Sequence, residues 1–403
     1  MKTIELLAPA GNLEKLKTAI HYGADAVYLG LSNLSLRAKA DNFDADGLKT
    51  AVQFCHQLGI KCYITINIFP HNIDLPIIKD HLEFIREICP DAIILSDLGV
   101  LDLALQYAPN IPIHISTQAN ITNSASAKFW QNIGAKRLIL SRELTINEIH
   151  EIRQSVSIEL ECFVHGSICI SYSGRCYMSS FLTNRSANHG ECTNSCRWNY
   201  TLMEEKRPNE YFPVYEDDRG TYIMSSRDLC MINHLDKLAQ AGVNSFKIEG
   251  RIKGINYVAG VVKVYRDAID SITNGDFKVK DEWMKELSMC SSRGYTTGMF
   301  LGKQPDIDYN HDENETYRMT HKLVGVIKSI TSDHIEIVLR NTLKVGERLD
   351  VLCAGSDNIT MVVQWIRDID GINIEIGKNE QTVIINPSNL VSVGDIIRRA
   401  IAE

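Results

Sequence analysis

The chain has 403 residues, of which 44% are hydrophobic and 23% are charged, and its formal net charge is -8. These proportions are ordinary for a globular protein, and the length suits two domains or one large barrel with a smaller partner. The acidic balance argues against indiscriminate nucleic-acid binding, although a local basic patch can still hold a specific RNA. No apolar run reaches the about 18 residues of a membrane span, and no signal peptide is evident, which together predict a cytoplasmic protein.

Short β-branched runs alternate with amphipathic helical patterns along the first three-quarters of the chain. The runs predict eight strands: Ile4–Ala8, Ala26–Leu29, Cys62–Asn67, Ala92–Ser96, Pro112–Ser116, Arg137–Ser141, Ile158–Val164 and Ser245–Glu249. The helical patterns include Leu13–Tyr22, Ala45–Leu58, Leu75–Cys89 and Ser124–Ile133. This alternation predicts an α/β fold of the (β/α)8 TIM-like barrel type. An open doubly wound sheet is the alternative, but no G-x-G-x-x-G motif follows the first strand.

One interval in the repeat is much longer than the others. The seventh and eighth predicted strands are about 80 residues apart, whereas the earlier strands follow one another at about 20 to 35 residues. The resulting insertion spans about residues 166–243 and carries five of the eleven cysteines. Because the loops that follow barrel strands lie on the catalytic face, the insertion is predicted to cover the barrel mouth.

A change of pattern predicts a second domain at the C-terminal end. We expect the barrel with its insertion at residues 1–302, a polar and acidic linker at 303–319, and a small all-β barrel at 320–403. The predicted strands of this second domain are Leu323–Ile330, His334–Leu339, Arg348–Cys353, Met361–Ile366 and Ile372–Ile376. Such a domain is often used for docking or RNA contacts, and a merely structural cap is an equal alternative.

Four cysteines of the insertion follow the pattern Cys169-x6-Cys176-x15-Cys192-x3-Cys196. Four thiolates brought to one point can hold an iron–sulfur cluster or a structural zinc ion. The spacing lacks the paired C-x2-C knuckles of a zinc ribbon, which favours a 4Fe–4S cluster over zinc and over unligated thiols. Cys230 is an alternative fourth ligand in place of Cys196. The other cysteines are predicted to be small core residues: Cys55, Cys62, Cys89, Cys162, Cys290 and Cys353.

Polar residues near the ends of the predicted barrel strands are expected to meet at the mouth. The candidate acid and base groups are Glu143, His165, Lys247 and Glu249. The candidate substrate-binding residues are Arg37, Asn67, Gln118, Asn120, Arg142 and Arg251, and their arginines could clamp carboxylates or phosphates. Each position taken alone could be an ordinary surface residue, so the prediction depends on their joint convergence. The signatures of zinc metalloproteases, serine hydrolases and phosphate-binding loops are missing from the sequence.

Several longer motifs are typical of a known family. They include E-L-L-A-P-A-G, Y-G-A-D-A-V-Y-L-G, I-H-I-S-T-Q-A-N, F-V-H-G-S-I-C-I-S-Y-S-G-R-C, C-T-N-S-C-R-W and F-K-I-E-G-R. From Ile4 to about Phe300, the chain resembles the collagenase-like family of peptidases of unassigned catalytic type. Within that family it is most similar to the members that act in prephenate-dependent hydroxylation of tRNA uridine.

The resemblance implies hydroxylation of the wobble uridine of tRNA to 5-hydroxyuridine, with prephenate, a small dicarboxylate, as co-substrate. It implies a 4Fe–4S cluster on Cys169, Cys176, Cys192 and Cys196, with Cys230 as the alternative fourth ligand. tRNA is the expected partner, no membrane is expected, an accessory protein is a further candidate, and the oligomeric state stays open. The alternatives are a collagenase-like peptidase, hydroxylation of ribosomal RNA or of a quinone, and a non-catalytic cluster-bearing partner protein.

Overall fold

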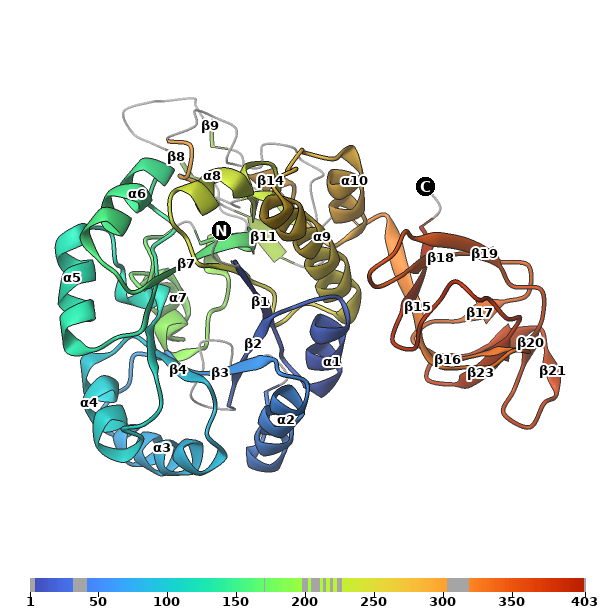
Figure 1. The fold of residues 1–403 in the computed structure, drawn as a ribbon, viewed down its shortest axis with the longest axis horizontal. Coiled ribbons are helices and arrows are strands. Elements are labelled where there is room, and N and C mark those ends of the chain that lie inside the picture. The colour runs from blue at the N-terminus through green and yellow to red at the C-terminus, as the bar shows by residue number, and fades with distance from the viewer. Residues whose placement is uncertain are drawn as a thin grey trace.

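The computed structural model describes most of the chain as two bodies that lie side by side, a barrel ringed by helices and a smaller β body that ends at the C-terminus (Figure 1). The described residues are 4–31, 42–169, 171–197, 202–203, 211–212, 215–217, 220–222, 227–302 and 319–401. No helix within these ranges has both the length and the apolar character needed to cross a membrane.

In the described part of the chain, the strands of the first body form a closed parallel barrel. They are β1 (Glu5–Pro9), β2 (Ala26–Gly30), β3 (Lys61–Ile66), β4 (Ala92–Leu95), β5 (Ile113–Ile115), β6 (Arg137–Ile139), β7 (Glu159–Gly166) and β13 (Ser245–Ile248). The strands pair in chain order, and β13 closes the ring by pairing with both β1 and β7. The predicted TIM-like barrel is confirmed, and each predicted barrel strand agrees with an observed one to within two residues.

Several of the surrounding helices begin at a polar residue whose side chain caps them. They are α1 (Leu13–His21), α2 (Ala45–Gln57), α3 (Leu75–Ile88), α4 (Leu98–Tyr107), α5 (Ser124–Ile133), α6 (Ile146–Ser155), α8 (Leu235–Gln240) and α9 (Ile255–Asn274). The side chains of Asn12, Asp44, Asp97 and Asn123 each accept a hydrogen bond from a backbone N–H in the first turn of the next helix. Because such caps end the strand-to-helix loops, they fix the backbone around the barrel mouth.

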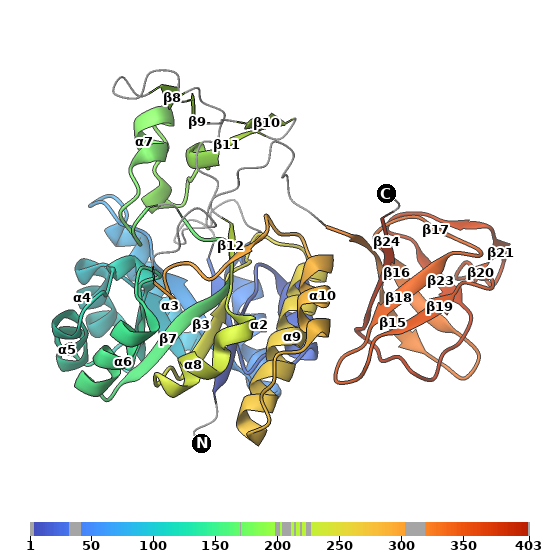
Figure 2. The same cartoon turned by 90° about the horizontal axis from the view of Figure 1, so that it is seen from above.

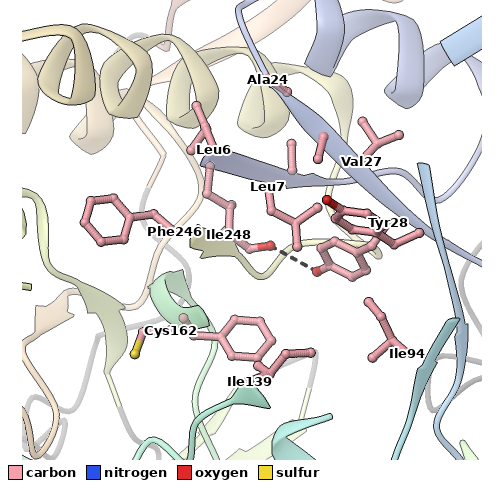
Figure 3. Close-up of a cluster of buried hydrophobic side chains, with 14 of the residues drawn as sticks. Leu6, Leu7, Ala24, Val27, Tyr28, Ile94, Ile139, Cys162, Phe246 and Ile248 are labelled. Atoms are coloured by element: carbon pink, nitrogen blue, oxygen red, sulfur yellow. Dashed lines mark hydrogen bonds between the residues drawn. The ribbon is translucent and has the colours of Figure 1, made fainter. Parts of the chain in front are cut away.

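The barrel interior contains both a cluster of apolar side chains and a cluster of charged side chains. Figure 3 shows Leu6, Leu7, Phe246 and Ile248 packed with neighbouring strands, and the Tyr28 hydroxyl donates a hydrogen bond to the Ile248 carbonyl at 3.0 Å. The charged cluster is centred on Arg137, which lies on β6 and is paired with buried carboxylates on β1 and β7. Desolvation by burial opposes the charge of Arg137, but the carboxylates of Glu161 and Glu5 raise its pKa above the ordinary value.

The insertion lies between β7 and β13, above the barrel (Figure 2). Its described elements include α7 (Met178–Thr183), short 3-10 turns at Ala187–His189 and Ser195–Arg197, and the strand pieces β8 (Leu202–Met203), β9 (Tyr211–Phe212), β10 (Tyr215–Asp217) and β11 (Gly220–Tyr222). It ends at β12 (Asp228–Cys230), which pairs antiparallel with β7 and parallel with β14 (Tyr295–Thr296). The insertion is therefore attached to the sheet at both of its ends.

The C-terminal body is an antiparallel all-β domain, as predicted. Its strands are β15 (His321–Ile330), β16 (Ile335–Leu339), β17 (Leu343–Lys344), β18 (Arg348–Leu352), β19 (Ile359–Val362), β20 (Ile366–Arg367), β21 (Asn373–Ile374), β22 (Ile376–Gly377), β23 (Thr382–Ile385) and β24 (Ile396–Ala400). Two of the strand predictions are wrong. The run Met361–Ile366 is divided between β19 and β20, and the run Ile372–Ile376 is divided between β21 and β22. In each case the two strands pair with different partners. The sequence also missed β24, which pairs with both β15 and β18.

A buried ion pair joins the two bodies. Arg398 of β24 is 0% exposed and donates two hydrogen bonds to the carboxylate of Glu286 on α10 (Asp281–Met289). It also donates to Asp350 of its own domain at 2.6 Å. Beside this pair, the hydroxyl of Tyr22 donates to the Leu352 carbonyl at 2.6 Å and accepts from the Ile396 N–H at 2.9 Å. The two bodies are thus held together by satisfied, buried polar groups.

We predict that Arg398→Met destabilises the protein by about 3 to 5 kcal/mol, because it leaves the Glu286 carboxylate buried without its cation. The matched control is Arg399→Met on the same strand. Arg399 is partly exposed and pairs with Glu347 at 2.8 Å, so its loss should cost only about 0 to 1 kcal/mol. Chemical denaturation of both variants measures the difference, and equal losses would contradict the role given to Arg398.

Candidate functional site at the barrel mouth

A small polar cavity of about 60 Å³ lies among the carboxyl ends of the barrel strands. Six of the predicted site residues line it: Asn67, Gln118, Arg142, Lys247, Glu249 and Arg251. The rest of the lining consists of Tyr28, Thr65, Ile94, Ser116, Thr117, Ile139 and Phe163. The structure thus brings together residues from the ends of several strands, which is how catalytic sites are built in this fold.

Lys247 is a buried cation in the lining of this cavity. Its Nζ lies 2.9 Å from Glu161 and sits over the rings of Tyr28 and Phe163, at 4.4 and 5.3 Å from their centroids. Burial lowers the pKa of Lys247 below its ordinary value, although the carboxylate of Glu161 opposes the shift. Such an amine can hold a proton for, or pass it to, a group that enters the cavity.

Two arginines supply further positive charge to the cavity. Arg142 stacks over the Phe163 ring at 4.1 Å and donates to the Ser167 carbonyl at 2.8 Å. Arg251 is buried and donates to Thr65 and Asn42 at 3.2 and 2.5 Å. Three cations around one cavity, with Glu249 as the lining carboxylate, favour a ligand that carries negative charge.

The other predicted mouth residues have different positions. Glu143 does not line the cavity; it accepts hydrogen bonds from the backbone N–H and hydroxyl of Ser173, at 2.6 and 3.1 Å. Asn120 adopts a left-handed backbone conformation with φ of 54° at the end of a short 3-10 turn, and it also lies outside the cavity lining. Arg37 lies outside the described residues.

His165 is buried near the end of β7, among three tyrosine rings, and it also lies outside the cavity lining. Its Nδ1 lies 3.2 Å from the hydroxyl of Tyr265. Burial lowers the pKa of His165 to about 3, so the imidazole is neutral at physiological pH. In this position the side chain packs inside the barrel wall.

The first part of the insertion forms a roof that is fastened to the mouth. The hydroxyl of Thr117 donates to that of Ser173 at 3.4 Å, and Phe69 donates its N–H to the Asn188 carbonyl at 2.9 Å. His189 lies 3.1 Å from Asp74, in the loop that follows β3. With the contact between Ser173 and Glu143, these bonds attach residues 173–189 to the ends of β3, β5 and β6. The roof is therefore fastened to the rim of the cavity, since Thr117 is one of the lining residues.

Gly174 allows the closest approach between roof and mouth. Its φ is +71°, and a Cβ added there would overlap the carbonyl oxygen of Gln118. Only glycine combines this backbone conformation with this lack of space. In the sequence, the pair Ser173-Gly174 indicates a tight turn. The contact of that turn with Gln118 could be found only from the fold.

Exposure separates the predicted cluster ligands from most other cysteines. Cys169 is exposed and Cys176, Cys192 and Cys196 are partly exposed, and all eleven cysteines of the chain are free thiols. Cys55, Cys62, Cys162, Cys290 and Cys353 are buried, as predicted for core residues. The prediction for Cys89 is wrong: it is exposed because it ends α3 in a left-handed conformation, with φ of 49°.

The four predicted ligands suit an iron–sulfur cluster by their chemistry, since they are accessible thiols of one insertion. Among the described residues, no group of three or more histidine, cysteine, aspartate or glutamate side chains is arranged to hold a metal ion. Cys230 differs from the four, because it is buried on β12 with its sulfur 3.9 Å from the Tyr265 hydroxyl. Burial raises the pKa of the Cys230 thiol to about 11.

Comparison with known proteins places this architecture in a family. Residues 11–310 match the model of peptidase family U32, and residues 319–398 match the model of the peptidase family U32 C-terminal domain. The chain belongs to peptidase family U32. Within this family, the resemblance seen in the sequence motifs is confirmed, and the two matched regions correspond to the barrel with its insertion and to the all-β domain.

Named U32 relatives match along nearly the whole chain. The tRNA hydroxylation protein P1 of Bacillus subtilis is 36% identical over 98% of this chain and 95% of its own length. The tRNA hydroxylation protein P of Escherichia coli is 38% identical over 89% of this chain and 88% of its own. A protein of Methanocaldococcus jannaschii named as an uncharacterized protease is 39% identical over 98% of both chains.

We predict that Gly174→Ala detaches the roof from the mouth of this U32 protein, because the new methyl group cannot share space with the Gln118 carbonyl. Hydrogen exchange of the amides of residues 171–176 should become faster. The matched control is Gly59→Ala, which has a φ of +70° and no atom within 4 Å of the added Cβ. It carries the same backbone strain without the collision, so faster exchange of the roof in both variants would count against this contact.

Proposed function

We propose that the protein hydroxylates the wobble uridine of tRNA to 5-hydroxyuridine in the cytoplasm, in a prephenate-dependent reaction that uses a 4Fe–4S cluster. The observation that carries the proposal is the match, over nearly the whole chain, to proteins named for tRNA hydroxylation. The cavity supports it as well, since a cationic barrel mouth under a cysteine-bearing roof can combine anion binding with redox chemistry.

In this proposal, Arg142, Arg251 and Lys247 bind a carboxylate of prephenate. The cavity of about 60 Å³ would receive the carboxylate, and the rest of the molecule would extend toward the roof. Lys247 and Glu249 are the groups within the lining that can hold or move a proton. Glu143 has a positioning role here, because its carboxylate holds Ser173 of the roof.

The cluster would be held by Cys169, Cys176 and Cys192, with Cys196 or Cys230 as the fourth ligand. When bound, it would supply electron transfer to a reaction that adds oxygen to a pyrimidine ring. Cys196 has the accessibility of the other three, whereas recruitment of Cys230 requires its buried thiol to lose a proton and become accessible.

We predict that Cys176→Ser protein purified without oxygen loses most of its bound iron and acid-labile sulfide, because one thiolate of the cluster is missing. Cys89→Ser is the matched control, since Cys89 is the exposed cysteine that lies outside the insertion. The same measurement on Cys196→Ser and Cys230→Ser identifies the fourth ligand as the variant that loses the iron. A wild-type protein that binds zinc and no iron would refute the cluster.

We predict that tRNA from cells without this gene lacks 5-hydroxyuridine and its derivatives when its nucleosides are measured by mass spectrometry. Wild-type protein should restore the nucleoside, whereas the Cys169→Ala variant should not, because the cluster cannot form. Cys89→Ser should restore it. An unchanged tRNA profile, with loss of a hydroxylated nucleoside from ribosomal RNA, would move the assignment to the larger RNA.

The family name and the protease-named relative make peptidase activity the second candidate. The described lining of the cavity contains neither a histidine nor a cysteine that could serve as a peptidase nucleophile or base. Collagen or gelatin cleavage by the purified protein, abolished by Lys247→Met but unaffected by loss of iron, would favour the peptidase.

A further inference from the structure

The roof differs from the rest of the described surface in its exposed aromatic residues. Tyr172, Tyr177 and Phe181 are 64%, 71% and 76% exposed. Within the described ranges, these are three of the four exposed large aromatic residues, and the other is Phe129 on α5. Elsewhere, the exposed large apolar residues of the described chain are aliphatic. Exposed aromatic rings gathered in ten residues are unusual, because burial in a core would stabilise them.

The rings are placed on a fixed support. Phe181 donates its N–H to the Tyr177 carbonyl at 2.9 Å, so these two residues are one turn apart on the same side of α7. Cys176, directly before Tyr177, accepts a hydrogen bond at its carbonyl from Asn188, and Ser173, directly after Tyr172, is bound by Glu143. The backbone that carries the rings is therefore attached to the barrel, while the rings themselves are exposed to solvent.

The same segment is basic in an acidic protein. Residues 162–190 contain Arg175 and Arg185 and no aspartate or glutamate, whereas the whole chain has a net charge of -8. Arg175 is exposed between Tyr172 and Tyr177. The neighbouring carboxylate of Asp74 is engaged by His189, and that of Glu143 by Ser173. The aromatic face thus carries a local positive charge.

We propose that Tyr172, Tyr177 and Phe181 form a stacking surface for unpaired bases of the RNA substrate, with Arg175 on the phosphate backbone. The alternation of aromatic and basic side chains is the pattern by which proteins bind single-stranded nucleic acid, because each base stacks on a ring and each phosphate needs a cation. The three residues belong to the segment that is bonded to the barrel mouth through Ser173 and Asn188, so an RNA loop held there is bound next to the mouth. This inference rests on the proposed function and names the part of the protein that binds the RNA loop.

The test is fluorescence anisotropy of a labelled anticodon stem-loop with the full-length, iron-loaded protein. Tyr177→Ala and Phe181→Ala should each weaken binding roughly tenfold, and Tyr177→Phe by no more than about twofold, since it keeps the ring. Phe129→Ala, which removes an exposed ring from α5, should leave the affinity unchanged. Arg175→Gln should reduce the slope of log affinity against log salt concentration by about 1, which corresponds to the loss of one phosphate contact.

Two further readouts keep the outcomes distinct. Bound iron in the Tyr177→Ala protein reports whether the adjacent Cys176 is still in place, so a loss of RNA binding with full iron content supports the surface. If wild-type protein binds and hydroxylates the RNA, and the double variant Tyr177→Ala/Phe181→Ala does so with unchanged KM, the stacking surface is refuted and the proposed function stands. If wild-type protein neither binds nor hydroxylates the RNA, the proposed function itself is refuted.

Discussion

A buried charge cluster around Glu161 joins three neighbouring strands of the barrel. This carboxylate is fully buried on β7, and it lies 3.0 Å from Arg137 of β6 and 2.9 Å from Lys247 of β13. A buried carboxylate without partners is strongly destabilising, so folding must bring both cations to it. The pairing fixes three neighbouring strands around one point, and it holds Lys247 in the lining of the mouth cavity.

A series of contacts connects Lys247 to the roof. Lys247 and Arg142 both lie over the ring of Phe163, and Arg142 donates to the carbonyl of Ser167, where the insertion begins. The roof is then fixed a second time through Ser173. The cationic cavity and the cysteine-bearing insertion are therefore joined by a continuous set of contacts through Phe163, Arg142 and Ser167.

The acidity of the chain and the proposed RNA partner are compatible because charge is distributed unevenly. The segment from 162 to 190 has no carboxylate, and it lies next to a cavity with three cations. RNA association depends on the local field near the phosphates, since exposed charges farther than about 10 Å are largely screened at moderate salt. A protein with net negative charge can thus bind RNA at one face and avoid indiscriminate binding elsewhere.

The sequence by itself determined the barrel and the all-β domain, because strand and helix periodicity depends on neighbouring residues. It also identified six of the thirteen residues that line the cavity, since the ends of parallel strands necessarily meet at one mouth. The tertiary structure alone decided that Glu143 binds the roof, that His165 packs inside the wall, and that Cys89 is exposed. It likewise decided that β24, with two arginines in five residues, is a central strand, because the partner of Arg398 lies on α10 more than a hundred residues away. Such pairings join residues that are far apart in the sequence, so they cannot be predicted from the pattern of neighbouring residues.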